Sequence, residues 1–401
     1  MKKEAKKVVL AYSGGLDTSV AVKWLLENKA EEVITVVIDV GQKEENLEAI
    51  RDKALKIGAS QSFIKDAKKE FVENYVWKAL KANASYEFGY PLATAIARPL
   101  IAKLVNEVAQ EVGADALAHG CTGKGNDQVR FELAWKALNP NAKIIAPARE
   151  WGAELLDRNK AIDYAQKHNI PISLTKKSPY SIDLNAWGKS IECGILEDPW
   201  VEAPEDAFSL TKPIKDTPNE PEYIEINFKQ GIPTGINNKE LDSLSLVEEL
   251  NKIVGNHGIG RYDQIENRLV GIKSREIYEA PAATVLLRAH KELEYFVNPK
   301  DSMHFKSLID QKYSELIYNG FWFSPLRNAL DAFIEETQKK ATGTIRVKLF
   351  KGNFQVVGRA SENSLYNKKL ASYGDEDIFD HSSAKGFINL LGLGIKTYYQ
   401  K

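Results

Sequence analysis

Residues 8–19 combine an apolar run with a glycine pair and hydroxyl side chains, in the order VVLAYSGGLDTS. The run at 8–12 is short and rich in β-formers, and apolar residues return at helical spacing from 18 to 26. These patterns predict a strand, a tight loop and a helix N-terminus. Such a loop aims unpaired N–H groups and a helix dipole at one point, and Gly14 and Gly15 leave room for a phosphate there. Ser13, Thr18 and Ser19 add hydroxyl donors.

Three other structures could place glycines after a strand, and they differ in the residue spacing that they require. A tight turn that needs a positive φ also places a glycine pair after a strand. The loop lacks the lysine and second glycine of a Walker A motif, and it lacks the G-x-G-x-x-G spacing of dinucleotide folds. Neither of those two nucleotide sites therefore fits the sequence.

A second glycine-rich loop repeats this design at residues 118–132, which read AHGCTGKGNDQVRFE between an expected strand and an expected helix. Lys124 adds a point charge, and Thr122 and Asn126 can hydrogen-bond a carboxylate or an amide. Asp127 repels phosphate, so we expect it to accept from a substrate ammonium, with a helix N-cap as the plainer alternative. Arg130 lies one turn further along, where its guanidinium could hold a carboxylate bidentately.

Both loops are expected at the same edge of one sheet. The patterns predict strands at 8–12, 33–39, 61–65, 114–118 and 143–146, alternating with helices at 18–26, 45–57, 68–83 and 93–112. This alternation indicates an α/β fold with a doubly wound parallel sheet covered on both faces. Ligands bind beyond the carboxyl ends of such strands, which is where both glycine-rich loops stand.

The domain organisation is inferred from a change in composition. Prolines between residues 170 and 221 break every periodic pattern, so we expect a nucleotide-binding domain at 1–170, a second α+β synthetase domain at 171–360 and a helical tail at 361–401. The second domain should contain a strand at 222–228, helices at 244–254 and 282–296, and a hairpin at 344–350 and 354–357. The tail carries an amphipathic helix at 384–391 with little to pack on, which favours docking onto another subunit.

Composition excludes several classes of function. The chain has 401 residues, 54 basic and 55 acidic, and a net charge of −1, which argues against a strongly basic nucleic-acid face. Residues 1–7 are followed directly by an expected strand, without a long apolar h-region or a small-residue cleavage site, and no uncharged apolar run of about 18 residues occurs, so we expect a cytoplasmic protein without a membrane partner. Two cysteines and six histidines without metal-binding spacing predict no protein-held zinc. Any metal should arrive with a nucleotide.

Five separated motifs together resemble the argininosuccinate synthase family, which belongs to the N-type ATP pyrophosphatases of HUP fold. They are residues 11–19, residues 119–132, SIECG at 190–194, ENR at 266–268 and KSREIYE at 273–279. The resemblance covers essentially the whole chain. It implies ligation of L-citrulline and L-aspartate through a citrulline adenylate, with ATP and its Mg²⁺ as substrate, AMP and pyrophosphate as products, and a homotetramer.

The resemblance also implies a role for particular residues. ATP would be bound by Ala11, Tyr12, Ser13, Gly14, Gly15, Leu16, Asp17, Thr18, Ser19, Ile38 and Gly120. L-aspartate would be bound by Thr122, Asn126 and Asp127. L-citrulline would be bound by Tyr90, Asn126, Arg130, Ser181, Ser190, Glu266 and Tyr278. Charge moving onto pyrophosphate would be stabilised by the N–H groups and side chains of Ser13, Gly14, Gly15, Asp17, Thr18 and Ser19, by Lys124 and by the nucleotide's Mg²⁺, and no general base is identified.

Three positions depart from the family pattern, namely Ala95 in place of a serine, Leu184 in place of a glutamate and Ala148 in place of a tryptophan. Without the resemblance, Ser181 and Ser190 would be interpreted as loop hydroxyls, Tyr90 and Tyr278 as half-buried aromatics, and Glu266 as a surface charge. Two other functions stay open at this point. One is a different ATP pyrophosphatase, such as an amide synthetase or a tRNA-modifying ligase, and the other is a non-catalytic nucleotide-binding protein.

Overall fold

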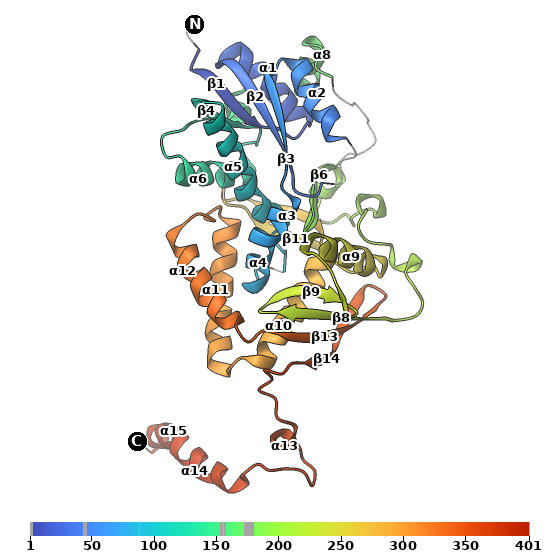
Figure 1. The fold of residues 1–401 in the computed structure, drawn as a ribbon, viewed down its shortest axis with the longest axis vertical. Coiled ribbons are helices and arrows are strands. Elements are labelled where there is room, and N and C mark those ends of the chain that lie inside the picture. The colour runs from blue at the N-terminus through green and yellow to red at the C-terminus, as the bar shows by residue number, and fades with distance from the viewer. Residues whose placement is uncertain are drawn as a thin grey trace.

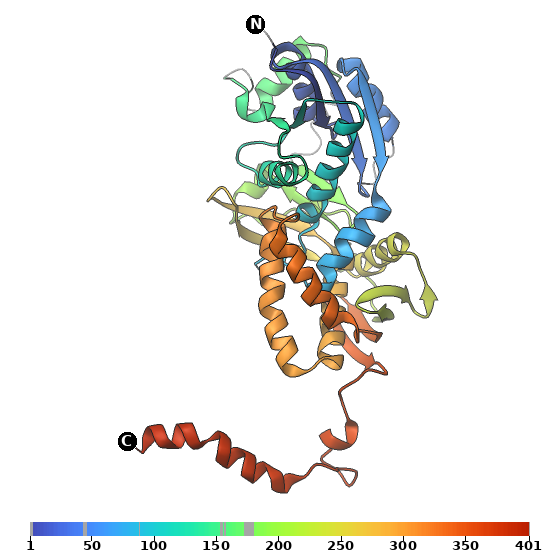
Figure 2. The ribbon, with the colours of Figure 1, turned by 60° about the vertical axis from the view of Figure 1, so that its left-hand side comes forward.

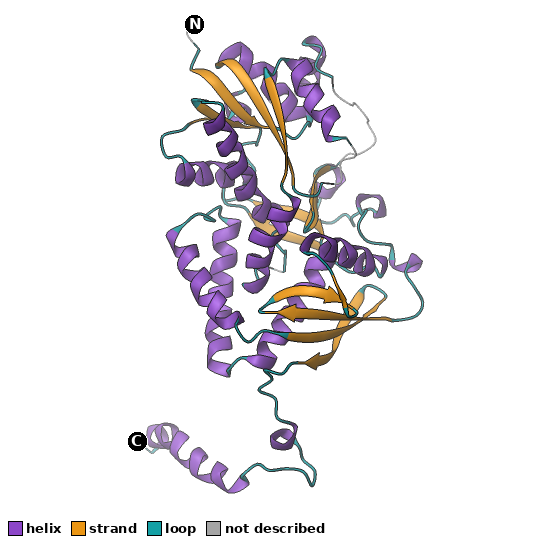
Figure 3. Ribbon diagram, viewed as in Figure 1, coloured by secondary structure: helices purple, strands orange, loops and turns teal. Residues whose placement is uncertain are grey.

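The computed structural model describes residues 3–42, 46–87, 89–152, 155, 158–171 and 180–400. Figure 1 shows a parallel sheet near the N-terminus, then antiparallel sheets with long helices, and finally a tail that leads away from them. Figure 3 shows that the tail contains helices without strands, whereas the rest of the chain mixes both. The molecule is therefore α/β in its first part and α+β in its second part.

Five parallel strands form the N-terminal sheet, in the order β3-β2-β1-β4-β5. Their bounds are β1 Ala5–Ala11, β2 Ala30–Asp39, β3 Gln61–Asp66, β4 Ala116–His119 and β5 Lys143–Ile145. β1 lies in the middle, and its apolar side chains are buried on both faces, as a central parallel strand requires. All five predicted strands are present, and the predicted doubly wound sheet is confirmed.

Helices cover both faces of this sheet. One face packs against α1 and α2 through residues such as Val22 and Ala54, and the other packs against α5 and α6 through residues such as Ile96 and Trp135. The bounds are α1 Leu16–Asn28, α2 Leu47–Ile57, α5 Ala93–Glu111, α6 Asp127–Leu138, α7 Pro147–Glu150 and α8 Arg158–Lys167. Glu45, the first residue of the helix predicted at 45–57, lies outside the described residues. Pro179, one of the prolines between residues 170 and 221, also lies outside them.

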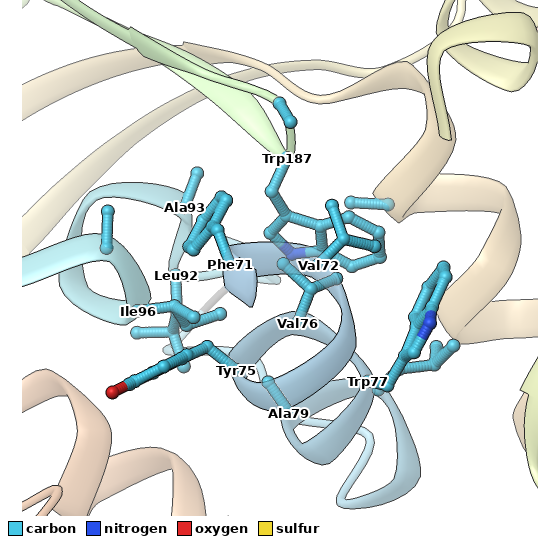
Figure 4. Close-up of a cluster of buried hydrophobic side chains, with 14 of the residues drawn as sticks. Phe71, Val72, Tyr75, Val76, Trp77, Ala79, Leu92, Ala93, Ile96 and Trp187 are labelled. Atoms are coloured by element: carbon cyan, nitrogen blue, oxygen red, sulfur yellow. The ribbon is translucent and has the colours of Figure 1, made fainter. Parts of the chain in front are cut away.

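The helix predicted at 68–83 is continuous but not regular. It runs as α3 (Lys68–Phe71), a π-helical turn (Val72–Val76) and α4 (Trp77–Lys81). Its apolar side chains meet Trp187 from the middle sheet, and Figure 4 shows Phe71, Val72 and Val76 close to that indole. This contact helps to fix the parallel-sheet part of the chain against the sheets that follow it.

The middle sheet corrects an expectation from the sequence. Residues 170–221 were expected to lack periodic structure, but β6 (Ser181–Asn185) and β7 (Gly188–Glu192) form a hairpin there. The prediction was wrong because the prolines flank the hairpin, while residues 181–184 alternate polar and apolar as a strand does. β11 (Arg261–Asn267) and β12 (Lys273–Glu279) complete an antiparallel sheet in the order β11-β12-β7-β6.

A second antiparallel sheet and a group of helices form the remainder of the body. The sheet has the order β10-β9-β8-β13-β14, and it contains the predicted hairpin. Its bounds are β8 Glu222–Lys229, β9 Ile232–Ile236, β10 Lys239–Glu240, β13 Gly343–Phe350 and β14 Asn353–Ala360. The helices are α9 Ser243–Asn256, α10 Pro281–Val297, α11 Lys300–Tyr318 and α12 Pro325–Gln338. Of these helices, the sequence predicted α9 and α10 and missed α11 and α12.

Where α4, α10, α11 and α12 meet, a buried group of polar side chains replaces the apolar core. We call it the helix-junction cluster, and it consists of Asn83, His290, Glu294, Lys306, Asp310 and Gln338. The ammonium of Lys306 lies 3.1 Å from the Glu294 carboxylate and 2.7 Å from that of Asp310. The amide groups of Asn83 and Gln338 donate to Glu294 at 2.6 Å each. Lys306, Glu294 and His290 are fully buried.

The tail leaves the body after β14. It contains α13 (Lys368–Ala371), α14 (His381–Leu391) and α15 (Leu393–Tyr399), and Figures 1 and 2 show from two directions that α14 and α15 extend away from the rest of the chain. The predicted helix at 384–391 is present within α14. Its apolar side chains are exposed, including Phe387, Ile388, Leu390 and Leu391.

Within the part of the chain that the structure describes, no helix has both the length and the apolar character needed to cross a membrane.

Candidate active site

The first glycine-rich loop joins β1 to α1, as the sequence predicts. Gly14 has a φ of 76°, and a Cβ placed there would lie 2.8 Å from Ile50 Cγ2, so glycine is required on both counts. The hydroxyls of Ser13 and Thr18 lie 3.1 Å apart at the mouth of the loop. Lys53 on α2 donates to the Gly14 carbonyl at 2.7 Å, and this support was not found from the sequence.

The second glycine-rich loop joins β4 to α6 and touches the first. A Cβ on Gly120 would lie 2.8 Å from Thr18 Cγ2, so the two loops pack directly against each other at this point. The His119 ring is fully buried and lies 3.3 Å from the Glu132 carboxylate. Its Nδ1 accepts from the Cys121 amide at 3.2 Å. This histidine therefore holds the start of the loop and has no exposed atom to offer a ligand.

A cavity of about 1470 Å³ opens between the two loops and the middle sheet. Most residues predicted for ATP line it, namely Ala11, Tyr12, Ser13, Gly15, Leu16, Asp17, Thr18, Ile38 and Gly120, together with Thr122, Lys124 and Ser181. Gly14 and Ser19 belong to the first loop but do not line the cavity. The departures Ala148 and Leu184 also line it. The other residues predicted for the two amino acids do not line the cavity, and Asp127 is connected to it through Arg98, which lines it and pairs with Asp127.

Asp127 is the centre of an ion-pair network and not a helix cap. It is the first residue of α6, and Arg130 one turn later donates to its carboxylate at 2.8 Å. Arg98 on α5, which the sequence did not single out, donates to the same carboxylate at 2.9 Å and also pairs with Asp183 of β6. Burial opposes the charge on Asp127, but Arg98 and Arg130 outweigh it and lower its pKa.

The residues predicted for citrulline lie next to one another. The rings of Tyr90 and Tyr278 stack with centroids 3.8 Å apart, and burial raises the pKa of both hydroxyls. Glu266 accepts from the Tyr278 hydroxyl and, at 2.8 Å, from the Tyr318 hydroxyl. Ser190 is the cross-strand neighbour of Tyr278. Sequence positions separated by nearly 190 residues therefore meet at a single surface.

Asn126 connects this surface to α11, and Thr94 connects it to α5. The Asn126 amide donates to the Tyr318 hydroxyl at 2.9 Å, and its oxygen accepts from the Leu269 amide at 2.9 Å. The Thr94 hydroxyl lies 3.5 Å from that of Ser190. Ala95 itself is buried, so Thr94 supplies a hydroxyl close to the one that Ala95 lacks.

The middle sheet turns one fully polar face toward this site. Residues of one face recur at every second position, and paired residues on neighbouring strands share that face. The face carries Ser181 and Asp183 on β6, Ser190 and Glu192 on β7, Ser274, Glu276 and Tyr278 on β12, and Gln264 and Glu266 on β11. On the opposite face Ile191 and Ile277 pack against Leu196 and Ala207, and charged side chains such as Arg261, Asp263 and Arg275 lie on that face as well. Polar and apolar residues alternate clearly along β6, so alternation could have marked Ser181 and Asp183 but not the residues of β11 and β12.

Arg268 crosses the end of this polar face. Its guanidinium donates to Glu192 at 2.6 Å and to Glu276 at 2.5 Å. Burial of Glu276, with Glu192 close by, raises the pKa of the Glu276 carboxyl to about 7. The Ser274 hydroxyl donates to the same carboxylate at 2.9 Å. The site therefore holds a carboxyl group that titrates near neutral pH.

Carboxylates outnumber guanidiniums among the charged side chains at this site. We call this group the site cluster, and it consists of Arg98, Asp127, Arg130, Asp183, Glu192, Glu266, Arg268 and Glu276. Five of these side chains are acids and three are bases. The arrangement can accept cationic groups from the cavity, and the two loops beside it can accept phosphates.

Comparisons with known proteins agree with this geometry. The model of the arginosuccinate synthase N-terminal HUP domain matches residues 7–171, and that of the arginosuccinate synthase C-terminal domain matches residues 180–398. The argininosuccinate synthase of Symbiobacterium thermophilum is 56% identical over 98% of this chain and 97% of its own length. Those of Acaryochloris marina and a Nostoc species are 58% and 57% identical over 99% of this chain, and over 99% and 98% of their own lengths. The chain belongs to the argininosuccinate synthase family of enzymes.

Proposed function

We propose that the enzyme joins L-citrulline and L-aspartate to form argininosuccinate, a step of arginine biosynthesis, at the expense of ATP. The observation that carries the proposal is a single cavity bordered by two phosphate-type loops and by a polar sheet face rich in carboxylates. The first feature suits a nucleotide, and the second suits the ammonium groups of amino acids.

ATP would lie with its phosphates over the two glycine-rich loops. Amide groups of the first loop and the hydroxyls of Ser13 and Thr18 would hold the pyrophosphate, with Lys124 as a nearby point charge. The base would lie toward Ile38 at the end of β2. Mg²⁺ would enter as part of the nucleotide, with Asp17 of the first loop facing the same cavity.

The citrulline site would be formed by Tyr90, Asn126, Arg130, Ser181, Ser190, Glu266 and Tyr278. Citrulline is a zwitterion, so it needs a cation and an anion at a fixed separation. Arg130 supplies a guanidinium for its carboxylate, and Glu266 supplies a carboxylate for its ammonium. Burial of the tyrosine pair around Glu266 would strengthen both interactions by excluding water.

The aspartate site would use Thr122, Asn126 and Asp127, on the side of the second loop. Thr122 and Asn126 offer hydrogen bonds for the substrate carboxylates, and Asp127 offers a carboxylate for the amine. The pairing of Asp127 with Arg98 and Arg130 favours this role, because it keeps Asp127 ionised and fixed in place.

The reaction would proceed in two steps. The ureido oxygen of citrulline attacks the α-phosphorus of ATP, so that pyrophosphate leaves and a citrulline adenylate forms. The aspartate amine then attacks the activated ureido carbon, loses a proton and displaces AMP. The protein contributes positioning and charge neutralisation, without a covalent intermediate on a side chain.

Phosphorus NMR of one reaction mixture tests the proposal. With ATP, citrulline and aspartate present, AMP and pyrophosphate should appear together, and neither should accumulate over repeated turnovers if either amino acid is omitted. Formation of ADP and phosphate would refute an α–β cleaving site. Turnover that is independent of citrulline would point to a different member of the ATP pyrophosphatases.

We further propose a homotetramer that acts in the cytoplasm, where ATP and free amino acids are available, without a nucleic-acid or membrane partner. The exposed apolar side chains of α14 and α15 support docking of the tail onto another subunit. Light scattering of the full chain and of a chain ending before Ser361 tests this. A truncated chain with an unchanged oligomeric state and solubility would remove the argument.

A further inference from the structure

Arg268 touches more separate segments than a simple strand-end ion pair requires. It follows β11 at the turn into β12, and its side chain is 17% exposed. Nη2 donates to Glu192 of β7 and Glu276 of β12, and Nε donates to the Ser274 hydroxyl at 2.8 Å. One guanidinium therefore joins the turn to two strands of the polar sheet face.

The same turn also forms hydrogen bonds with the second glycine-rich loop. Nη1 of Arg268 donates to the Lys124 carbonyl at 3.4 Å, and the next residue, Leu269, donates its amide to the Asn126 side chain at 2.9 Å. These contacts lie on either side of Gly125, at the end of the loop that carries the proposed aspartate residues. The other end of the loop, at Gly120, is held separately by its packing against Thr18.

We propose that Arg268 is a positioning residue for the second chemical step. It holds the 122–126 segment at a fixed distance from the polar sheet face, and thereby aligns bound aspartate with the citrulline adenylate. The inference rests on the proposed function, because it assigns aspartate to this loop and citrulline to the sheet.

An arginine suits this task because its planar group offers five donors in fixed directions. Two carboxylates, one hydroxyl and one backbone carbonyl surround it from different sides. A lysine would retain the positive charge near Glu192 and Glu276, but a single ammonium cannot also span the gap to the Lys124 carbonyl. The Arg268→Lys variant therefore keeps the positive charge beside the two carboxylates but loses the link from the sheet to the second glycine-rich loop.

The test measures the two steps separately in Arg268→Lys. Rapid-quench measurement of pyrophosphate formed in one turnover from ATP and citrulline, without aspartate, reports the first step. Steady-state argininosuccinate formation with aspartate varied reports the full reaction. We expect the pyrophosphate rate to fall clearly less than kcat/KM for aspartate, because the first loop and Gly120 keep their supports, although Lys124 and Asn126 also serve the first step. We expect kcat/KM for aspartate to fall roughly 10- to 100-fold, as loss of a charge-assisted hydrogen bond implies.

Arg261→Lys is the matched control. Arg261 is the first residue of β11, the strand that precedes Arg268; it pairs with Glu205 on the opposite face of the sheet, so both measurements should match wild type. Retained pyrophosphate formation in Arg268→Lys also demonstrates a folded enzyme. Equal losses in both steps, or no loss in either, would overturn the inference. Failure of the wild-type enzyme to form pyrophosphate from ATP and citrulline would instead refute the adenylate mechanism.

Discussion

The site cluster and the helix-junction cluster are both groups of paired charged side chains, but the first borders an open cavity, where the Glu192 side chain is 40% exposed, and the second lies in the interior. In the helix-junction cluster, Lys306 lies between Glu294 and Asp310 and also donates to the Lys81 carbonyl at 2.8 Å. In the site cluster, five acids face three bases beside a large cavity. The helix-junction cluster finds its partners in the interior, whereas the site cluster borders the cavity and contains more acids than bases.

Both ring nitrogens of the histidine in the helix-junction cluster have hydrogen-bond partners within that cluster. Nδ1 of His290 lies 2.8 Å from Asn83 Oδ1, and Nε2 lies 2.8 Å from Gln338 Oε1. Burial lowers the pKa of this ring. The ring nitrogens, the two amides and the buried ions therefore all find partners inside the cluster.

This difference teaches which buried charges serve the fold and which serve the chemistry. A closed cluster stabilises only while every member is present, since removal of one partner leaves a buried charge without compensation. In an open cluster with excess carboxylates, the acids repel one another in the free enzyme, and cationic groups of bound substrates would reduce that repulsion. Substitutions in the two clusters should therefore affect different measurements.

The largest expected effect is on stability, from Lys306→Met. This change leaves Glu294 and Asp310 buried together without their cation, and should lower the free energy of unfolding by about 3–5 kcal/mol. Urea unfolding measures it. Lys312→Met on the same helix removes an exposed pair with Glu315 and should cost less than about 1 kcal/mol. Similar losses for both lysines would show that burial of the cluster has no special cost.

A pH-dependent effect is expected from Glu276→Gln. The pKa of Glu276 is raised from 4.5 to about 7, so the folded protein holds this proton more tightly than the unfolded chain does. The wild type should lose stability relative to the glutamine variant as pH rises from 4.5 to 7, by about 3 kcal/mol in total. Unfolding of both proteins at several values between pH 5 and 8 measures the difference. A difference independent of pH would mean that Glu276 is ionised normally.

A smaller effect, on catalysis, is expected from Asp127→Asn. The change keeps the shape of the side chain and removes its charge, so kcat/KM for aspartate should fall by the equivalent of about 1.5–3 kcal/mol. Steady-state kinetics with each substrate varied measures this. Arg130→Lys should instead weaken citrulline, because lysine lacks the bidentate fork. An unchanged aspartate dependence together with a raised citrulline KM in Asp127→Asn would reverse the two assignments.

Much of the fold could be predicted from local patterns. The strands of the parallel sheet and both glycine-rich loops follow from apolar runs and from glycine placement, which are properties of neighbouring residues. The hairpin at β6 and β7 was missed because five-residue strands give a weak pattern beside many prolines. The helices α11 and α12 were missed as well, although each is amphipathic over three or more turns.

Some residues of the candidate site could be singled out from the sequence and others could not, for a physical reason. Asp127 and Arg130 stand in a motif, so residue type and spacing marked them. Arg98 and Asp183 gain their roles only because α5 and β6 approach α6 in space, and nothing in their local sequence records that approach. The helix-cap alternative for Asp127 is wrong because α6 begins at Asp127 and its N-cap position is Asn126.

We expect substrate ammonium groups to supply the positive charge that the site cluster lacks. Calorimetric titration tests it by comparing L-citrulline with 5-ureidopentanoate, which is citrulline without its amino group, in the presence of an ATP analogue that cannot be cleaved between the α- and β-phosphates. The account predicts that the analogue binds roughly 10- to 100-fold more weakly, since a charge-assisted hydrogen bond to a buried carboxylate is lost. Equal affinities for the two compounds would contradict it.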